Sequence, residues 1–250
     1  MSSTIVESQV HILLLDIEGT TTPVDFVYKT LFPYARRKLE SFILEHFREA
    51  EIASLIRQLY MQHDAHDSQR LQPPSWIDEQ VESRLRSCIE FCKWLMVKDS
   101  KATPLKSLQG KIWEVGYDKG ELQGEVYPDV PPALKRWRLQ RREICIYSSG
   151  SVLSQQLLFH SIPSGDLTPL IAAFFNTSVG AKTETESYIR IAQTLTRSPH
   201  DFLFISDAVN EVIAANDAGM QAILCNRDAH ASQSREPNIF IHSFDEILRE

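Results

Sequence analysis

The residues best suited to chemistry in this chain follow short apolar runs. They are, in chain order, Asp16 and Glu18, Ser148 and Ser149, Lys182, and Asp207. A carboxylate nucleophile can take up a phosphoryl group and pass it to water in two steps. Two further carboxylates can hold a divalent cation, while a lysine and hydroxyl groups can bind phosphate oxygens. Together these residue types predict hydrolysis of a phosphate ester.

Each of these residues has a simpler explanation when it is taken alone. An Asp followed by Gly-Thr is a common turn former, and a Ser or Asp after a strand often caps the next helix. A lysine near a helix start is usually exposed. Four separate strand ends would have to carry the right residue types by chance, so their joint occurrence favours one shared site.

The stretch His11–Pro23, HILLLDIEGTTTP, is typical of a buried strand followed by a tight turn. Its apolar run ends at Asp16, and Glu18 stands two positions further on. Ionised carboxylates are costly to bury unless a cation or hydrogen-bond donors meet them. Because Gly19 permits a turn in which backbone amides face inward, this loop offers two acids and backbone donors together.

Strands alternate with helices from about Glu125 onward. The predicted strands are apolar and lack polar alternation: Glu143–Tyr147, Ile171–Phe175, Phe202–Ile205, Gln221–Cys225 and a weak Asn238–Ile241. One predicted helix runs from after Ser151 to about His160. The other predicted helices are Lys182–Thr196, Glu211–Ala218 and Phe244–Leu248. Such strands form a parallel sheet covered on both faces, and right-handed crossovers bring their carboxyl ends to one edge. We therefore predict an α/β fold, a doubly wound parallel sheet that binds its ligand at that edge.

Residues 25–124 interrupt this alternation with a block rich in helix formers. Apolar residues recur at helical spacing in Tyr34–Phe47, Ile52–Tyr60, a segment from about Trp76 through Leu95, and Pro104–Leu122. A block of about a hundred residues has the size of a small domain. We predict an inserted all-helical domain at 25–124 and a catalytic α/β core formed by residues 1–24 and 125–250.

Two polar segments suggest other functions but have simpler explanations. The sequence HDAHDS at His63–Ser68 has the residue types of a metal site, yet it lies in a polar break between helices. We expect a solvated loop there. The basic run Lys135–Arg142 could contact nucleic acid, but Leu134 and Trp137 lie one turn apart beside it. This spacing indicates an amphipathic helix with a solvated basic face.

The composition limits the classes of partner. A formal net charge of −7 and a pI near 5.6 argue against nucleic acid or an anionic membrane, since both select a basic face. We expect no signal peptide, because the first residues lack a basic segment followed by an apolar one, and no apolar run is long enough to span a bilayer. The four cysteines lack metal-ligand spacing, and we expect them to be reduced core residues of a cytoplasmic protein.

With these residues assembled, the chain resembles the haloacid dehalogenase superfamily of aspartyl-nucleophile phosphatases. The resemblance rests on D-x-E-G-T at Asp16–Thr20, S-S-G at Ser148–Gly150, Lys182, and S-D at Ser206–Asp207. It implies a haloacid dehalogenase-like core with an inserted helical cap. Most phosphatases of the superfamily have Asp where this chain has Glu18, whose side chain is one methylene longer.

That difference narrows the resemblance to the enolase-phosphatase family of methionine salvage, the acireductone synthases. DIEGTTTP is followed by VDFV and LFPY, and further similar stretches are LQGKIW, YSSGS and GAKTETESY. The similarity covers nearly the whole chain. Members convert 2,3-diketo-5-methylthiopentyl-1-phosphate in two steps. They first enolise the diketone and then hydrolyse the phosphate. The product is 1,2-dihydroxy-3-keto-5-methylthiopentene, called acireductone.

The resemblance also implies roles for individual residues. Asp16 would be the nucleophile, and Glu18 would transfer protons. Both would join Asp207 in holding one Mg²⁺ ion per subunit, with the backbone carbonyl of Glu18 as a ligand. The substrate phosphate would be bound by Ser148, Ser149 and Lys182. The family resemblance further suggests a monomer whose helical cap closes over the site and excludes water.

Three alternatives remain open. A phosphatase of the same fold could act on another small phosphate ester, such as a sugar phosphate, since the sequence says little about the cap. A binding protein could keep the scaffold without catalysis, although the acids and the lysine are all retained. A dehalogenase fits less well, because its chemistry has no use for Glu18 or Asp207. Two departures from the family pattern, Asn176 and the turn Asn226–Asp228, do not touch the motif residues.

Overall fold

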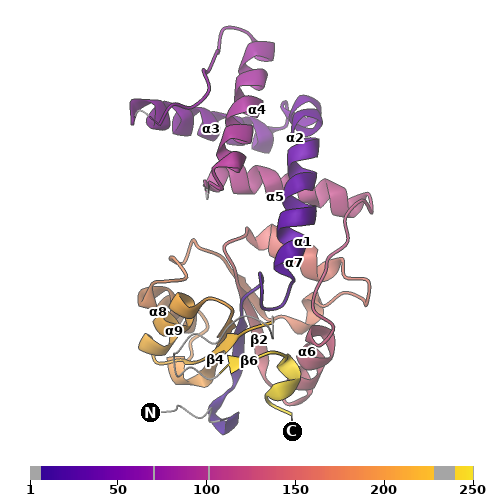
Figure 1. The fold of residues 1–250 in the computed structure, drawn as a ribbon, viewed down its shortest axis with the longest axis vertical. Coiled ribbons are helices and arrows are strands. Elements are labelled where there is room, and N and C mark those ends of the chain that lie inside the picture. Colours follow the sequence, from indigo (N-terminus) through magenta and orange to yellow (C-terminus); the bar gives the residue numbers. More distant parts are fainter. Residues whose placement is uncertain (1–6, 70, 101, 228–239, 250) are drawn as a thin grey trace. The chain divides into compact units, whose positions relative to one another are not determined.

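A computed structural model describes residues 7–69, 71–100, 102–227 and 240–249 of the chain (Figure 1). The chain forms two compact units. One unit combines the residues up to Val27 with those from Gln123 onward, and the other is Tyr28–Leu122. The first unit therefore consists of two chain segments that are separated in sequence by the second.

The first unit contains a six-stranded sheet within the described residues. Its strands are β1 Ile12–Leu15, β2 Glu143–Tyr147, β3 Ala173–Phe175, β4 Phe202–Ser206, β5 Gln221–Cys225 and β6 Phe240–Ile241. All neighbouring strands are parallel, in the order β3-β2-β1-β4-β5-β6. Leu15 is level with Ile146 of β2 and Ile205 of β4, so the residues that follow these three strands leave the sheet at the same height. The predicted α/β fold is confirmed.

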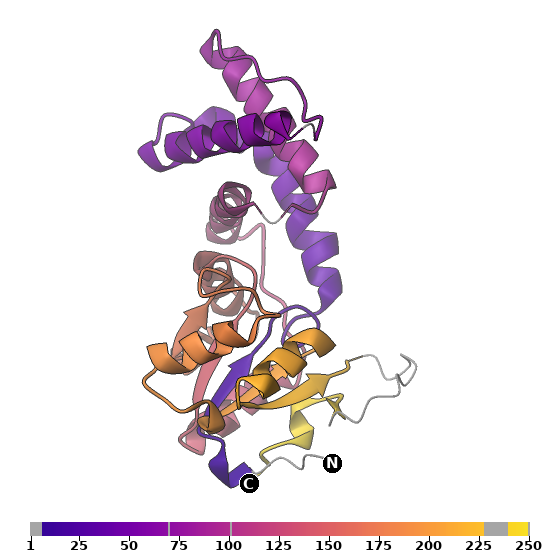
Figure 2. The same cartoon turned by 90° about the vertical axis from the view of Figure 1, so that its left-hand side faces the viewer.

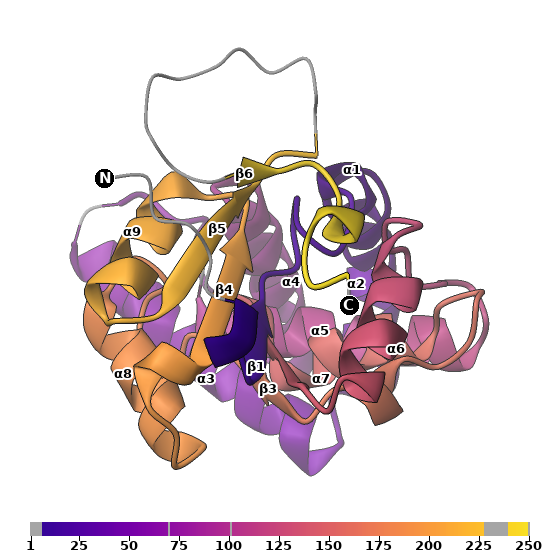
Figure 3. The same ribbon diagram turned by 90° about the horizontal axis from the view of Figure 1, so that it is seen from below.

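Helices cover both faces of this sheet (Figure 3). The helices are α6 Val130–Leu139 and α7 Val152–His160 on one side, and α8 Thr185–Thr194 and α9 Val209–Asp217 on the other. Strand β1 is buried along its whole length, as its continuous aliphatic run predicts. Ile12 and Leu14 belong to one apolar cluster with Tyr188 and Ile191 of α8 and Ala215 of α9. A fully buried strand therefore delivers Asp16 to the sheet edge from a rigid position.

The second unit is helical, as its apolar spacing predicts (Figure 2). A short α1 Val24–Phe26 and a π-helical stretch, Val27–Leu31, lead into it from the first unit. Its helices are α2 Phe32–His46, α3 Ala50–Ser68, α4 Val81–Val97 and α5 Thr103–Asp118. Helix α5 packs on both α2 and α3, and α4 also packs on these two. The indole of Trp113 on α5 donates a 2.9 Å hydrogen bond to the carbonyl of Leu31.

The expected solvated loop at residues 63–68 is wrong, because α3 continues through it to Ser68. His63 is buried, and its Nε2 donates a 2.7 Å hydrogen bond to the carbonyl of Pro74. Its ring lies 5.0 Å from the ring of Phe91, and His66 contacts the same phenyl ring. The histidines therefore serve as packing residues between α3 and α4, and these tertiary contacts outweigh the polar character of the segment.

Other differences concern the ends of elements. Helix α4 begins at Val81 and not near Trp76, because an extended stretch precedes it. The expected terminal helix at Phe244–Leu248 is only a 3₁₀ turn, Phe244–Glu246. Residues 238 and 239 of the last predicted strand lie outside the described residues. The four cysteines are buried and free, which agrees with the predicted core role. None of the described helices has the length and apolar character needed to cross a bilayer.

Candidate active site

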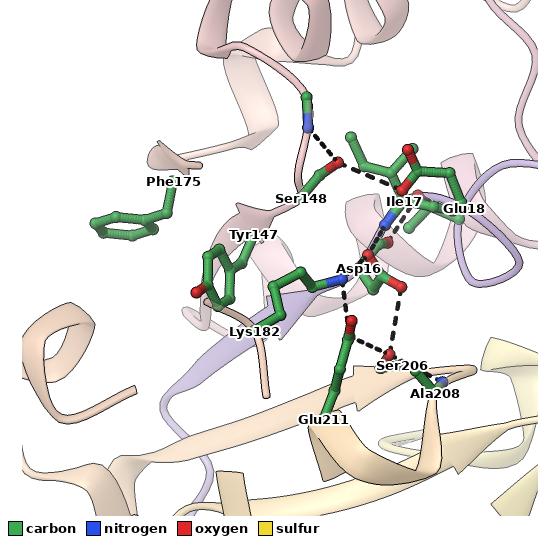
Figure 4. A network of polar contacts seen from close by, with 12 residues as sticks. Asp16, Ile17, Glu18, Tyr147, Ser148, Phe175, Lys182, Ser206, Ala208 and Glu211 are labelled. Atoms are coloured by element: carbon green, nitrogen blue, oxygen red, sulfur yellow. Dashed lines mark hydrogen bonds and ion pairs between the residues drawn. The ribbon is translucent and has the colours of Figure 1, made fainter. Parts of the chain in front are cut away.

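Asp16 lies at the carboxyl end of β1 and is almost fully buried. Its Oδ1 accepts a 2.7 Å hydrogen bond from the backbone N–H of Ile17 and a short contact from the ammonium of Lys182. Its Oδ2 lies 3.3 Å from the hydroxyl of Ser206, at the end of β4 (Figure 4). These donors compensate the cost of burying an ionised carboxylate and fix its orientation.

The loop that follows Asp16 depends on Gly19, which has a φ of +74°. This left-handed conformation lets the Gly19 N–H donate a 2.9 Å hydrogen bond to the carbonyl of Thr22. A Cβ atom at Gly19 would lie 2.1 Å from Oδ2 of Asp207. A glycine is therefore required twice here, once for the turn and once for the close approach of the Asp207 carboxylate.

Lys182 is buried in the loop before α8, and two acids share its ammonium. The Nζ atom contacts Asp16 and lies 2.8 Å from Oε2 of Glu211, on α9 (Figure 4). The hydroxyl of Tyr188 donates a 2.6 Å hydrogen bond to the backbone carbonyl of Lys182 and so anchors the loop. Burial by itself lowers the pKa of Lys182, but the charges of Asp16 and Glu211 outweigh it and raise the pKa above its ordinary value.

Ser148 and Ser149 follow β2 in the loop that leads to α7. The hydroxyl of Ser148 accepts a 3.2 Å hydrogen bond from the Gly150 N–H and donates to Oε2 of Glu18 at 3.4 Å. Helix α7 is capped by Ser151, which accepts from the N–H of Ser154. The capping role considered for Ser148 and Ser149 is therefore taken by another residue. Ser148 is buried next to Glu18, and Ser149 is partly exposed.

The side chain of Gln155 on α7 holds this loop in place. Its Nε2 donates to the carbonyls of Gly150, at 3.0 Å, and of Phe175 at the end of β3, at 2.9 Å. The backbone N–H of Ser148 also donates to the Phe175 carbonyl, at 3.2 Å. No local pattern indicated this role for Gln155, since it is one of two adjacent glutamines in an apolar helix and nothing nearby distinguishes them. Gln155 makes the serine loop a rigid part of the sheet edge.

Glu211 was not assigned a site role from the sequence, although it stands one helical turn after Asp207. Its Oε2 contacts Lys182 and lies 2.7 Å from the hydroxyl of Ser206. Burial and the nearby charge of Asp16 raise the pKa of Glu211, while Lys182 opposes that shift. The four-residue spacing from Asp207 was the only available signal, because the contact with Lys182 is made across the fold.

Asp207 follows β4 and brings a second carboxylate to the Gly19 turn. Desolvation of its carboxyl and the charge of Asp16 raise the pKa of Asp207 to about 7, although Lys182 lowers it. Lys182 can offset only one negative charge, whereas Asp16, Glu18 and Glu211 all lie near Asp207. An excess of carboxylate oxygens at one edge suits a hard divalent cation such as Mg²⁺.

A cluster of three or more acidic, histidine or cysteine side chains in metal-binding geometry does not occur within the described residues. The set expected from the sequence differs from such a cluster, because it combines the Asp16 and Asp207 carboxylates with a backbone carbonyl of Glu18. Its two side-chain ligands are Asp16, directly after β1, and Asp207, whose Oδ2 occupies the space that a Cβ at Gly19 would need. The chemistry of these donors therefore fits a bound Mg²⁺ ion.

The two departures from the family pattern lie at the ends of β3 and β5. The side-chain oxygen of Asn176 accepts from the backbone N–H of Ser178 at 3.0 Å, so it closes a local turn as an Asp would. Arg227 donates to the carbonyl of Thr20, the last residue of the D-x-E-G-T motif, so the expectation that this turn does not touch the motif residues is wrong. The remaining residue of that turn, Asp228, lies outside the described residues.

Known proteins resemble this chain over most of its length. The family profile of haloacid dehalogenase-like hydrolases matches residues 10–219. Enolase-phosphatase E1 of Synechococcus elongatus is 44% identical over 238 residues, which cover 94% of this chain and 96% of that protein. Enolase-phosphatase E1 of Drosophila melanogaster is 40% identical over 228 residues, which cover 90% of this chain and 87% of that protein.

A solved structure agrees with these sequence matches. The crystal structure of the UTR4 protein of Saccharomyces cerevisiae has a TM-score of 0.76 to this chain at 30% identity, and the match covers 94% of this chain and 99% of that one. The matched lengths include the helical unit as well as the sheet. The chain therefore belongs to the haloacid dehalogenase-like hydrolases and, within them, to the family of proteins named Enolase-phosphatase E1.

Proposed function

We propose that this protein is a bifunctional, Mg²⁺-dependent enolase-phosphatase that acts through a phosphorylated Asp16. Its substrate is 2,3-diketo-5-methylthiopentyl-1-phosphate, and its products are acireductone and inorganic phosphate. The observation that carries the proposal is the meeting of Asp16, Lys182 and the Glu18–Ser148 pair at the carboxyl ends of β1 and β2. The names of the relatives support the combination of an enolase and a phosphatase activity.

In the phosphatase step, the Asp16 carboxylate attacks phosphorus while the bond to the alcohol oxygen of the substrate breaks. Glu18 gives its proton to the leaving oxygen. Lys182, the hydroxyl of Ser148 and the neighbouring Ser149 bind the phosphate oxygens and stabilise their charge. Water then attacks the aspartyl phosphate, Glu18 takes a proton from that water, and phosphate leaves with Asp16 restored.

In the enolase step, which comes first, a base removes a carbon-bound proton next to the diketone and returns that proton to the carbonyl oxygen, so one C–H bond breaks, one O–H bond forms and the base is regenerated. We assign this base to Glu18. Its carboxylate lies 3.4 Å from Ser148, while Asp16 is held by Ile17, Ser206 and Lys182. Glu18 therefore has a position of its own, apart from the nucleophile, and its extra methylene compared with Asp extends its reach.

We assign one Mg²⁺ ion to the Asp16 and Asp207 carboxylates and the Glu18 carbonyl. When bound, it supplies positive charge that screens the acids from the phosphate dianion. We also propose that the helical unit, Tyr28–Leu122, acts as a cap that excludes water during enolisation, and that the protein works as a cytoplasmic monomer. Equal hydrogen exchange of the site loops with and without a phosphate analogue would count against the cap.

A panel of phosphate esters tests the substrate. The purified protein would be assayed with the diketo phosphate, several sugar phosphates and p-nitrophenyl phosphate, each with Mg²⁺ in excess. We expect kcat/KM for the diketo phosphate to exceed that for the other esters by at least about a hundredfold, the range in which pocket contacts discriminate between substrates. Equal values for all the esters would favour a general phosphatase of the same fold.

A further inference from the structure

Arg227, the second residue after β5, contacts the loop that follows Asp16. Its Nε and Nη2 atoms donate to the same carbonyl, that of Thr20, at 2.9 and 2.7 Å. Its Nη1 atom lies 2.6 Å from Oδ2 of Asp129 and 3.2 Å from the carbonyl of His242. Only the planar, multiply donating guanidinium can serve these acceptors together.

Asp129 is committed to this arginine although it stands at the start of α6. The first turn of α6 contains Pro131 and Pro132, which lack N–H groups, and Asp129 makes no side-chain cap. Its Oδ2 accepts instead from the hydroxyl of Ser243 at 2.9 Å and the N–H of Phe244 at 2.6 Å. Burial tends to raise the pKa of Asp129, but Arg227 and these donors hold it below its ordinary value.

The surroundings of the guanidinium leave it little freedom. Its central carbon lies 4.4 Å from the ring centroid of Tyr127 and 4.6 Å from that of Phe244. Only 9% of the Arg227 side chain is exposed, and 11% of its partner Asp129. A cation that is both stacked on aromatic rings and paired in a protected position is held firmly.

The acceptor of this arginine belongs to the turn that positions both proposed catalytic acids. Thr20 stands two residues after Glu18, and its neighbour Thr21 accepts a 3.0 Å hydrogen bond from the backbone N–H of Tyr127. The hydroxyl of Thr21 donates in turn to the carbonyl of Asp16 at 3.0 Å. The Thr20 carbonyl is therefore bonded by the guanidinium itself, and the Thr21 carbonyl by Tyr127, whose ring lies against that guanidinium.

We propose that Arg227 is a positioning residue, which fixes the Asp16–Thr22 turn through the Thr20 carbonyl and thereby sets the place of Glu18 relative to Asp16. The proposal rests on the proposed function, since it assigns the consequence to those two acids. Arg227 does not touch the reacting groups. Its loss leaves phosphate binding by Lys182 and Ser148 in place and misplaces the proton-transferring acid.

The test compares Arg227→Lys with Arg136→Lys, a matched control. Arg136 also ties down the C-terminal segment, because it donates to the carbonyls of Phe244 at 2.8 Å and Leu248 at 3.2 Å. Both substitutions remove a guanidinium that donates to carbonyls of the C-terminal segment. Of the two arginines, Arg227 is the one that also bonds the Asp16–Thr22 turn. Asp129→Asn is a second variant that keeps an acceptor for Ser243 and Phe244 while it removes the charge opposite Arg227.

We expect Arg227→Lys to lower kcat by roughly 10- to 100-fold, because small misplacements of catalytic groups have effects of this size. KM should change by less than about threefold, since the phosphate ligands are untouched. Amide exchange at residues 19–22 should accelerate in this variant. Asp129→Asn should show the same pattern more weakly, and Arg136→Lys should keep kcat and the exchange of that turn near wild type.

Wild-type kcat in Arg227→Lys, or an equal loss of kcat in Arg136→Lys, would overturn the proposal. So would unchanged amide exchange at residues 19–22. Each variant is assayed on both the diketo phosphate and p-nitrophenyl phosphate. If wild type hydrolyses only the second ester, the proposed substrate fails, while the role of Arg227 is still decided by that ester. If neither ester reacts, the rate of amide exchange at residues 19–22 in Arg227→Lys decides whether Arg227 fixes the turn.

Discussion

Glu211 holds the ammonium of Lys182 at 2.8 Å, and the same ammonium contacts the carboxylate of Asp16. Side-chain exposure of the three groups is only 15%, 9% and 4% respectively. An ammonium shared by two buried acids cannot swing away to solvent without leaving their charges uncompensated. Lys182 is therefore preorganised beside the nucleophile before any phosphate arrives, and charge stabilisation from a fixed group requires little rearrangement during reaction.

Glu211→Gln should weaken this preorganisation. The amide still accepts from Lys182 and from Ser206, but its charge is gone, so only Asp16 balances the charge of the ammonium. We expect kcat to fall by about tenfold with a smaller change in KM. Steady-state kinetics of phosphate release measures both constants. Glu186→Gln is the control, since Glu186 is an exposed acid on α8 that pairs with Arg190, and its kinetics should match wild type. Full activity in Glu211→Gln would contradict the role given to the pair.

Ser148→Ala should affect binding and chemistry, because it removes the hydroxyl that faces Glu18 and accepts from the Gly150 N–H. We expect kcat/KM to fall by roughly 10- to 100-fold. Ser151→Ala, three residues later, removes the cap of α7 and should cost about 1 kcal/mol of folding stability. Its KM should stay unchanged. The opposite ranking of the two variants in kcat/KM would place the phosphate elsewhere.

Gly19→Ala should displace the Asp207 carboxylate, since the new Cβ would lie 2.1 Å from its Oδ2. We expect at least a tenfold loss of Mg²⁺ affinity, about 1.4 kcal/mol, measured by calorimetric titration. Gly120→Ala is the matched control. Gly120 has a similar φ of +68°, but its Cβ would meet nothing within 4 Å. Gly120→Ala should lower the free energy of unfolding by about 1–2 kcal/mol through backbone strain, and its Mg²⁺ affinity should stay at the wild-type value.

Removal of divalent cations should stop phosphate release. The carboxylates around Asp207 carry more negative charge than Lys182 offsets, and a phosphate dianion would add to it. We expect activity to vanish in excess chelator and to return when Mg²⁺ is added back. Phosphate release at an undiminished rate in chelator would show that the carboxylates act without a metal.

The sequence predicted the sheet and its edge because each decisive signal was local. The aliphatic run before Asp16 predicted a buried strand, and β1 is fully buried. The run Glu143–Tyr147 became β2 with the same bounds. Parallel pairing then required Asp16, Ser148 and Ser206 to emerge at one edge, and the structure brings Asp16 and Ser206 to 3.3 Å.

Contacts made across the fold were beyond the reach of local patterns. Nothing near Glu211 indicates that it will meet Lys182, and nothing near Arg227 points to the carbonyl of Thr20. The polar segment around His63 is helical and not a loop for the same reason, since aromatic neighbours from α4 decide its burial. Periodicity identifies which residues face a core, whereas side-chain pairing depends on partners that are distant in sequence.

The most direct measurement follows enediol absorbance and phosphate release together during turnover of the diketo phosphate by wild type and Asp16→Asn. We predict that wild type produces acireductone and phosphate in equal amounts. Asp16→Asn should release phosphate at least about a thousandfold more slowly, because an amide cannot act as the nucleophile. Phosphate release by Asp16→Asn at the wild-type rate, or release by wild type without any enediol, would contradict the proposed enolase-phosphatase.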